Sequence, residues 1–122
     1  MTHPWFDRIS WSRQWQEIYL TDMVLAAVDK RARHPFRPPH GRLSIACLWF
    51  ALTRGLRTTL WSVDSHDYKL SGDEVERRLV NAKIKPGDVL LFHDDGEAAI
   101  QALDRLIPVW KARGLYCAAL PQ

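Results

Sequence analysis

The chain has 122 residues, of which 47% are hydrophobic and 25% are charged, and this composition predicts one folded domain and excludes a disordered chain. The net charge of +3 is small and no basic module interleaved with aromatic residues is present, so we expect no nucleic-acid binding. No apolar stretch approaches the roughly 20 residues of a membrane span and no signal peptide pattern is found, so we expect a cytoplasmic protein.

The first half of the chain predicts two helices. Residues 12–32 carry apolar side chains three and four positions apart, which indicates an amphipathic helix that Pro35 stops. A short extended segment follows at 36–39. Residues 43–54 form a second, apolar helix, and Gly55 is the residue type that typically follows a helix end.

The second half predicts strands that alternate with helices. Residues 57–63 are rich in β-branched and aromatic side chains and indicate a strand. Ser71 and Glu74 form a capping box that opens a helix, and the apolar residues 88–92 form the next, buried strand. Short apolar strands between helices predict an α/β fold with a parallel sheet.

The C-terminal part predicts one more helix and one more strand. Asp95 is placed to cap a helix over 96–113, and Pro108 should kink that helix or separate its last turn. Residues 115–120 are expected to form the final strand.

The cysteines and the tryptophans indicate how the core is packed. Cys47 and Cys117 each lie in an apolar stretch, which favours two buried free thiols. Six tryptophans are many for this length, and they indicate either a heavily aromatic core or a cleft for flat, amphipathic ligands such as sugars.

Titratable side chains follow three of the predicted extended segments, and in parallel sheets functional residues gather where strands end. His93 is the main candidate, because a histidine beside a carboxylate such as Asp64 has a fixed tautomer and suits general acid or base chemistry. A core histidine bonded to backbone is the alternative. The candidates lie in the sequences HPFRPPHG, WSVDSHDY and LLFHDD.

The first of these sequences supplies a cation on a backbone that prolines stiffen, followed by a glycine. Arg37 lies between prolines and an aromatic residue, and it could hold a carboxylate in a bidentate pair or form an ordinary salt bridge. Gly41 permits a close backbone approach, so the amide of His40 could face an oxyanion. Four histidines are candidate metal ligands, but none has a metal-binding spacing: His3, His40, His66 and His93.

Three sequences in this order resemble the motifs of the polysaccharide deacetylases, the NodB-homology family (carbohydrate esterase family four). FRPPHG resembles an Arg-Pro-Pro-aromatic-Gly motif, WSVDSHDY a Trp-x-x-Asp-x-x-Asp-Trp motif, and VLLFHD a Leu-x-His motif. The resemblance implies a metal-dependent hydrolase that removes N- or O-acetyl groups from a carbohydrate. It also implies that the chain is the C-terminal half of a distorted (β/α) barrel, as one partial domain over 1–122.

The resemblance assigns a role to each matching residue. His93 would be the general acid that protonates the leaving amine, Asp64 would tune it, and Arg37 would orient the catalytic base. The backbone at His40 would help to form the oxyanion hole. The acetyl group and the sugar would lie against residues of the same motifs: Pro39, Gly41, Trp61, Tyr68 and Leu91. Two positions depart from the family pattern, because His40 replaces a tyrosine and Tyr68 a tryptophan.

The opening MTHP resembles the end of a His-Ser/Thr-x-x-His motif, which makes His3 a ligand of a divalent metal, by expectation zinc. The earlier Thr-Phe-Asp-Asp motif, which would supply the base, is absent from the chain. We therefore expect that the chain alone does not hydrolyse amides, and that an opened barrel edge promotes self-association. The alternative function is that of a non-catalytic remnant that binds carbohydrate or a partner chain.

Overall fold

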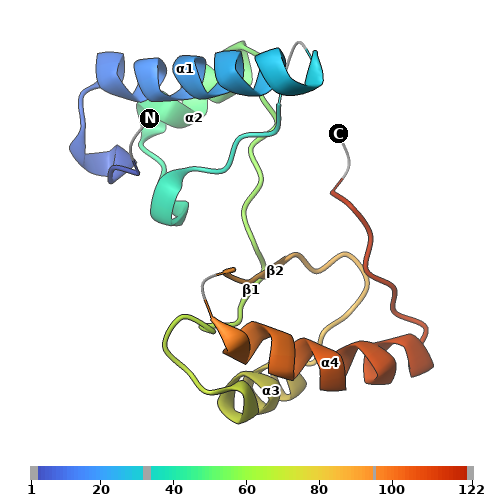
Figure 1. Cartoon of the computed structure of the whole chain (residues 1–122). Coiled ribbons are helices and arrows are strands. Elements are labelled where there is room, and N and C mark those ends of the chain that lie inside the picture. Colours follow the sequence, from blue (N-terminus) through green and yellow to red (C-terminus); the bar gives the residue numbers. More distant parts are fainter. Residues whose placement is uncertain (1–2, 32–33, 95, 121–122) are drawn as a thin grey trace. The chain divides into compact units, whose positions relative to one another are not determined.

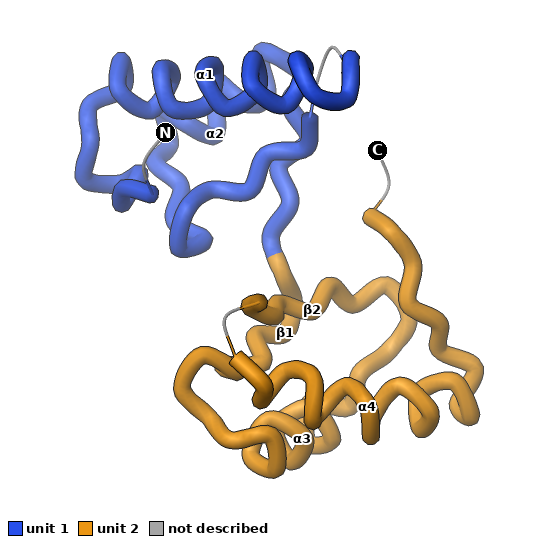
Figure 2. Tube along the Cα trace, viewed as in Figure 1, with its two compact units in different colours: residues 1–60, 122 blue, residues 61–121 orange. Residues whose placement is uncertain are grey.

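The computed structural model describes residues 3–31, 34–94 and 96–120, and its elements are labelled in Figure 1. These residues form two compact units, one that reaches to Leu60 and one that begins at Trp61 (Figure 2). Each unit has its own hydrophobic core. The expectation of one partial domain stays a prediction.

In the first unit, α1 (Trp11–Asp29) confirms the predicted helix, but its buried residues are Gln14, Glu17 and Ile18, whereas Tyr19 and Met23 of the predicted apolar face are exposed. The hydroxyl of Ser10 accepts a hydrogen bond from the backbone N–H of Arg13 at 3.4 Å and so caps the helix. The helix ends at Lys30, which adopts the left-handed conformation with φ +63°, and therefore stops before it reaches Pro35.

The second helix of this unit, α2 (Ile45–Thr53), was also predicted. The hydroxyl of Ser44 accepts a hydrogen bond from the N–H of Cys47 at 3.0 Å. Gly55 follows with φ +63°, a conformation that costs a glycine little, as its position after the helix predicts. Two short 3-10 helices complete the unit: η1 (Phe6–Arg8) and η2 (Pro39–Gly41).

The core of the first unit lies between the two helices and the segment before α1. Its buried members are Phe6, Ile18, Cys47 and Phe50. Cys47 is therefore buried as predicted. Among the tryptophans, all of which are described, only Trp110 in the other unit is buried, so tryptophan does not dominate either core.

In the second unit, two short parallel strands and two helices form an α/β arrangement. β1 (Val63–Asp64) pairs with β2 (Leu90–Leu91), with Val63 opposite Leu90 and Asp64 opposite Leu91. α3 (Gly72–Asn81) begins with the predicted capping box, and α4 (Glu97–Ala112) follows β2. The predicted parallel pairing is thus confirmed.

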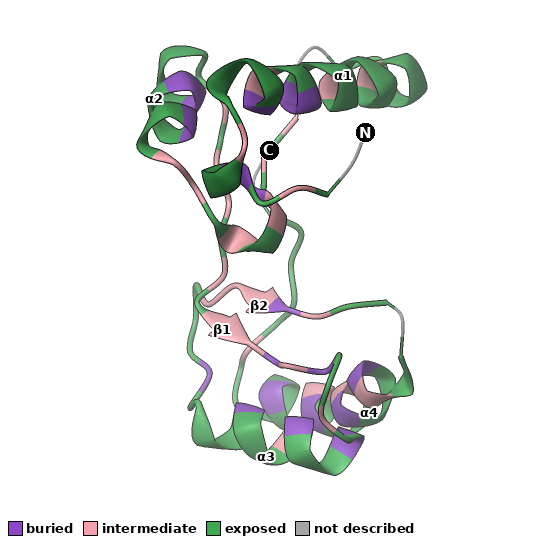
Figure 3. Ribbon diagram, turned by 90° about the vertical axis from the view of Figure 1, so that its left-hand side faces the viewer, coloured by how far each residue is buried: buried purple, intermediate pink, exposed green. Residues whose placement is uncertain are grey.

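The helices α3 and α4 pack together along one face, where their buried positions lie (Figure 3). Val75 and Leu79 are one turn apart on α3, and Ala102, Leu106 and Trp110 follow one another at four-residue intervals on α4. This i, i+4 spacing places each set on a single stripe of its helix. The core of the unit therefore forms from the two stripes.

The strands are shorter than predicted. The segment 57–63 was expected to be one strand, but only its last residue belongs to β1, and Thr58 forms a single parallel bridge with Phe36 in the first unit. The strand predicted over 88–92 is reduced to β2. A strand requires a partner whose backbone groups face it over several residues. Here that partner extends over only one or two positions.

Helix α4 continues through Pro108, so this proline does not separate the last turn, and the predicted alternative, a kink, stays a prediction. The final strand was predicted wrongly. Residues 115–120 are not a strand in the described part of the chain, and Cys117 within them is exposed rather than buried. The predicted cap Asp95 lies outside the described residues. None of the described helices combines the length and the apolar character that crossing a bilayer requires.

Candidate functional site

The second unit brings two of the predicted polar segments together. Because β1 and β2 are parallel, both end at the same edge of the sheet, and the residues that follow them emerge side by side. The N–H of Ser65 donates to the carbonyl of Leu91 at 3.2 Å and extends this pairing by one residue. His93 and Asp67 are thereby held in contact, although 26 positions separate them in the sequence.

The centre of the site is a doubly hydrogen-bonded pair of His93 and Asp67. The ring Nδ1–H of His93 donates to Oδ1 of Asp67 at 2.8 Å, and the backbone N–H of His93 donates to Oδ2 at 2.7 Å. The Asp67 side chain is only 3% exposed, whereas that of His93 is 37% exposed. The carboxylate is therefore buried beneath an accessible imidazole.

Asp67 is held in its ionised form by its surroundings. Burial by itself raises the pKa of this carboxyl, but the hydrogen bonds from the backbone and ring of His93 and from the Ser65 hydroxyl outweigh burial. The net result is a pKa below the ordinary value. A buried carboxylate that stays ionised can stabilise a positive charge on the neighbouring imidazole.

The second ring nitrogen of His93 is available for chemistry. Because Nδ1 carries the hydrogen that bonds Asp67, Nε2 has a lone pair when the ring is neutral and a transferable proton when the ring is protonated. Within the described residues, Nε2 has no hydrogen-bond partner, and the ring of Tyr68 packs edge-on against the imidazole at 5.0 Å between centroids. This arrangement suits a general acid or base.

The expected pairing of His93 with Asp64 is wrong. Asp64 instead accepts a hydrogen bond from the N–H of His66 at 2.9 Å, two residues further on, and its carbonyl accepts one from Nε of Arg78 at 2.7 Å. An aspartate at a strand end commonly bonds the backbone two residues later. Only after that turn does the chain present Asp67 to β2. Sequence reasoning missed Asp67, although it matches the second Asp of the quoted motif.

The other predicted residues of this unit differ in exposure. Leu91 is buried within β2, Trp61 is half-buried, and Tyr68 is exposed beside His93. Their expected contacts with a substrate stay predictions.

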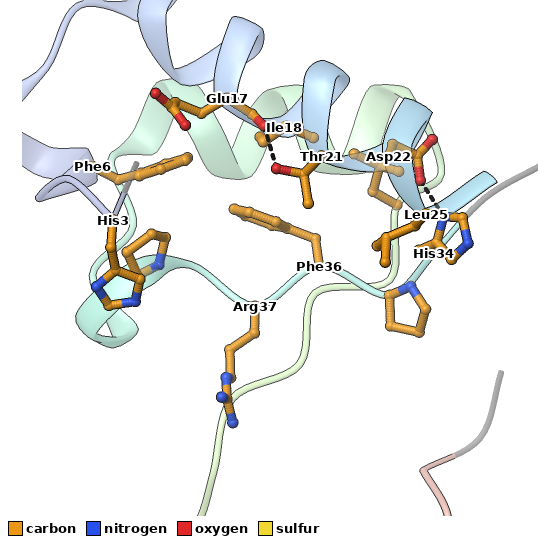
Figure 4. Close-up of a pocket in the computed structure, with 13 residues that line it drawn as sticks. His3, Phe6, Glu17, Ile18, Thr21, Asp22, Leu25, His34, Phe36 and Arg37 are labelled. Carbon is orange, nitrogen blue, oxygen red and sulfur yellow. Dashed lines mark hydrogen bonds and ion pairs between the residues drawn. The ribbon is translucent and has the colours of Figure 1, made fainter. Parts of the chain in front are cut away.

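The remaining predicted residues lie in the first unit, and three of them line a cavity of about 390 Å³ that Figure 4 shows: His3, Arg37 and Pro39. The guanidinium of Arg37 is exposed and has no hydrogen-bond or ion-pair partner within the described ranges. Its expected pairing with a carboxylate stays a prediction.

His40 and Gly41 belong to η2, beside this cavity. Both have positive φ, +54° and +67° respectively. The ring of His40 stacks on Trp5 at 4.1 Å between centroids and meets the ring of His3 edge-on at 4.5 Å. The histidine that replaces the family's tyrosine is thus fixed by aromatic contacts. The role of its backbone N–H at an oxyanion stays a prediction.

The described residues do not form a metal site by themselves. Among those that the structure describes, no three side chains of the His, Cys, Asp and Glu types lie close enough to hold a metal ion. A catalytic zinc typically has three protein ligands. His3 is a single candidate ligand, so the metal does not fit the described residues alone.

One histidine cluster in the first unit was not predicted. The two ring nitrogens of His34 bond two carboxylates of α1: Nδ1 bonds Asp22, as Figure 4 shows, and Nε2 bonds Asp29 at 3.0 Å. The hydrogen bonds to Asp22 and Asp29 raise the pKa of His34. The two aspartates are seven residues apart and share one helix face, which is the signal that sequence reasoning could have used.

Comparison with known proteins connects this geometry to a class of enzymes. The chain is 31% identical over 111 residues to a chitooligosaccharide deacetylase from Sinorhizobium fredii. This alignment covers 80% of the chain and 51% of that relative. It is 27% identical over 125 residues to a peptidoglycan-N-acetylglucosamine deacetylase from Bacillus cereus, with 98% and 45% covered. No protein-family profile matches the chain.

Solved structures agree with these relatives. The Bc1960 peptidoglycan N-acetylglucosamine deacetylase matches with a TM-score of 0.90 at 28% identity, over 98% of this chain and 58% of that one. A family 4 carbohydrate esterase from Streptomyces lividans matches with a TM-score of 0.85 at 25% identity, over 98% of this chain and 62% of that one. A family 4 pseudoenzyme from Bacillus anthracis matches with a TM-score of 0.83 at 27% identity, over 93% of this chain and 40% of that one.

The resemblance predicted from the motifs is therefore confirmed. The curated relatives and structural neighbours of the chain are polysaccharide and chitooligosaccharide deacetylases of carbohydrate esterase family 4. The chain spans about half the length of the curated relatives named above, which is consistent with a partial NodB-type domain.

Proposed function

We propose that this chain forms the general-acid part of a deacetylase that removes acetyl groups from an N-acetylated carbohydrate. The observation that carries the proposal is the His93–Asp67 pair at the edge where the two parallel strands end. The relatives support the substrate class, since they are named for the deacetylation of chitooligosaccharides and of N-acetylglucosamine in peptidoglycan.

The geometry of the pair supports proton transfer to the leaving group. When the C–N bond of an acetamide breaks, the departing amine must gain a proton, and Nε2 of His93 would supply it. The Asp67 carboxylate accepts the Nδ1–H bond throughout and stabilises the imidazolium before the transfer. After the transfer, His93 is neutral and keeps its proton on Nδ1.

We propose that Asp67 has the tuning role that the resemblance gave to Asp64, while Asp64 shapes the turn through the N–H of His66. The other assignments remain part of the proposal. Arg37 would bind the carboxylate of a catalytic base, and the backbone at His40 and Gly41 would face the oxyanion. The sugar and its acetyl group would contact Pro39, Trp61, Tyr68 and Leu91.

The fold and the metal belong to the same proposal. A half of a (β/α) barrel agrees with the parallel pairing of β1 with β2. A divalent metal, expected to be zinc, would need ligands in addition to His3, because the residues within the described ranges do not assemble a set of three.

We also propose that the 122 residues have no hydrolytic activity by themselves, because they carry no Thr-Phe-Asp-Asp motif that would supply a base. The alternative is a non-catalytic protein that binds carbohydrate or a partner chain. One observation favours it, namely the likeness to a family 4 pseudoenzyme. Self-association through the open sheet edge remains an expectation for either function.

The test begins with the in-frame codons upstream of Met1. If they encode His-Ser or His-Thr directly before Met1 and Thr-Phe-Asp-Asp farther back, acetate release from N-acetylchitooligosaccharides is measured on that longer chain, with and without Zn²⁺. We expect His93→Ala to reduce kcat by about 100-fold or more. Val80→Ala, on the exposed face of α3, is the matched control.

The outcomes separate the candidate functions. Unchanged turnover in a folded His93→Ala variant would overturn the general-acid assignment. Zn²⁺-dependent acetate release by the 122-residue chain would contradict its proposed inactivity. A stop codon upstream without the motifs, together with metal-independent sugar binding, would favour the non-catalytic alternative.

A further inference from the structure

We infer that Ser65 is a positioning residue of the acid–base site, whose buried hydroxyl holds the Asp67 carboxylate in the orientation that His93 requires. The inference rests on the proposed function, because it concerns the same site. It adds a third donor to the carboxylate, from a residue to which the quoted motifs assign no role.

Ser65 is itself rigidly placed. It follows β1 directly, has 0% exposure, and its backbone N–H donates to the carbonyl of Leu91 at 3.2 Å. The backbone that carries the hydroxyl is therefore fixed to the strand that leads to His93. A hydroxyl on such a support has little freedom to leave its partner.

The hydroxyl and Asp67 bond one another reciprocally. Oγ of Ser65 donates to Oδ1 of Asp67 at 2.9 Å, and it accepts the N–H of Asp67 at 3.3 Å. Oδ1 is also the oxygen that accepts the ring N–H of His93. Ser65 thus contacts the oxygen through which Asp67 acts on the imidazole.

Three donors define the carboxylate plane. The ring of His93 and the Ser65 hydroxyl approach Oδ1, and the backbone N–H of His93 approaches Oδ2. Removal of the hydroxyl leaves a buried gap beside a carboxylate that is 3% exposed. Without this hydrogen bond, less interaction energy offsets the cost of burying the negative charge of Asp67. The carboxylate also gains freedom to rotate.

A second serine in the same unit offers a matched control. Oγ of Ser62 donates to Oδ1 of Asp88 at 2.8 Å, which resembles the Ser65 contact in length. This pair is exposed and lies at the amino-terminal side of the two strands. Loss of the Ser62 hydroxyl should therefore affect Asp88 and leave Asp67 unchanged.

The experiment is an NMR titration of the aspartate side-chain carboxyl carbons in the 122-residue chain. We expect Ser65→Ala to move the Asp67 midpoint upward by about one pH unit and Ser65→Thr, which keeps a hydroxyl, to move it by much less. The Nδ1–H proton of His93 should exchange faster with water in Ser65→Ala. Ser62→Ala should shift Asp88 alone.

An unchanged Asp67 midpoint in folded Ser65→Ala would overturn the inference, as would an equal shift in Ser62→Ala. If Ser65→Ala does not fold, Ser65→Cys replaces it, because a thiol is a weaker donor of similar size. The Asp67 midpoint should then rise measurably, but by less than one pH unit. An unchanged midpoint in this variant would also overturn the inference. The titration needs no turnover. A chain that shows the shift but gives no acetate release when extended upstream would therefore retain the positioning role and lose the proposed function.

Discussion

The two units each contain a histidine that bonds aspartate, but the two histidines are used in opposite ways. In the first unit, both ring nitrogens of His34 bond carboxylates, and its side chain is 10% exposed. In the second unit, His93 bonds one carboxylate through one nitrogen and is 37% exposed. Both ring nitrogens of His34 are therefore occupied, whereas Nε2 of His93 has no partner among the described residues.

The supporting elements explain this contrast. Asp22 and Asp29 lie on one face of α1 and enclose the His34 ring between them. Asp67 lies beneath His93 at a strand end, and only its carboxylate approaches the ring. A helix face can present two carboxylates to one ring, whereas the end of a parallel strand pair leaves one side of the ring open.

The largest expected difference between the units is in thiol reactivity. Burial raises the pKa of Cys47 to about 11, so only about one molecule in a thousand carries the thiolate at pH 8. Cys117 in the second unit is exposed. We expect iodoacetamide to alkylate Cys117 at least about 100-fold faster than Cys47, as measured by peptide mass spectrometry over time.

Denaturation provides the control for this prediction, because both cysteines should react at similar rates in urea. Equal rates in the native chain would contradict the burial of Cys47 in the core of the first unit.

Substitution of Asp67 in the second unit should have the next largest effect, on stability and on the His93 ring. Asp67→Asn leaves one acceptor oxygen for two N–H groups of His93, so we expect a loss of about 1–3 kcal/mol in the free energy of unfolding. The ring ¹⁵N shifts of His93 should also change, since the Nδ1–H loses its charged acceptor. Both quantities are measured on the folded chain, by urea denaturation and NMR.

Asp64→Asn is the matched variant, because it alters the aspartate that bonds His66 instead. We expect the His93 ring shifts to remain as in the unsubstituted chain. A larger change of these shifts in Asp64→Asn than in Asp67→Asn would restore the original pairing of Asp64 with His93.

The smallest expected effect is the pH dependence of the His34 cluster. Its hydrogen bonds to Asp22 and Asp29 raise the pKa of His34 in the folded chain. The stabilisation is therefore fully present below the unfolded pKa, near 6.5, and is lost as the pH rises through the raised folded pKa. Arg31, 3.5 Å from Asp29, competes for that carboxylate.

We expect His34→Gln to lower Tm by a few degrees near pH 5.5 and by less above the folded pKa of His34. Asp22→Asn, which removes one of the two carboxylates, should give an intermediate pH dependence. Thermal unfolding at a series of pH values measures both. A Tm difference between His34→Gln and the unsubstituted chain that grows with rising pH would contradict the cluster.

Local signals were read correctly from the sequence. The capping box of Ser71 and Glu74, the glycine after α2 and the presence of a long helix at α1 depend on neighbouring residues, so each could be predicted within one element. The extent of the strands could not, because Thr58 finds a partner at one position only and residues 115–120 find none within the described ranges. Strand length depends on a distant segment that local propensity does not reveal.

The sequence by itself determined the motifs, their order and the family that they indicate, since these are properties of residue identity and spacing. It also determined that His93 follows a short apolar strand. Only the tertiary structure decided that Asp67 rather than Asp64 bonds His93, that Ser65 completes the carboxylate's donors, and that His34 is closed between two aspartates. The His93 and His34 pairings join residues of different segments, and side-chain hydrogen bonds form only where packing brings a donor within about 3 Å of its acceptor.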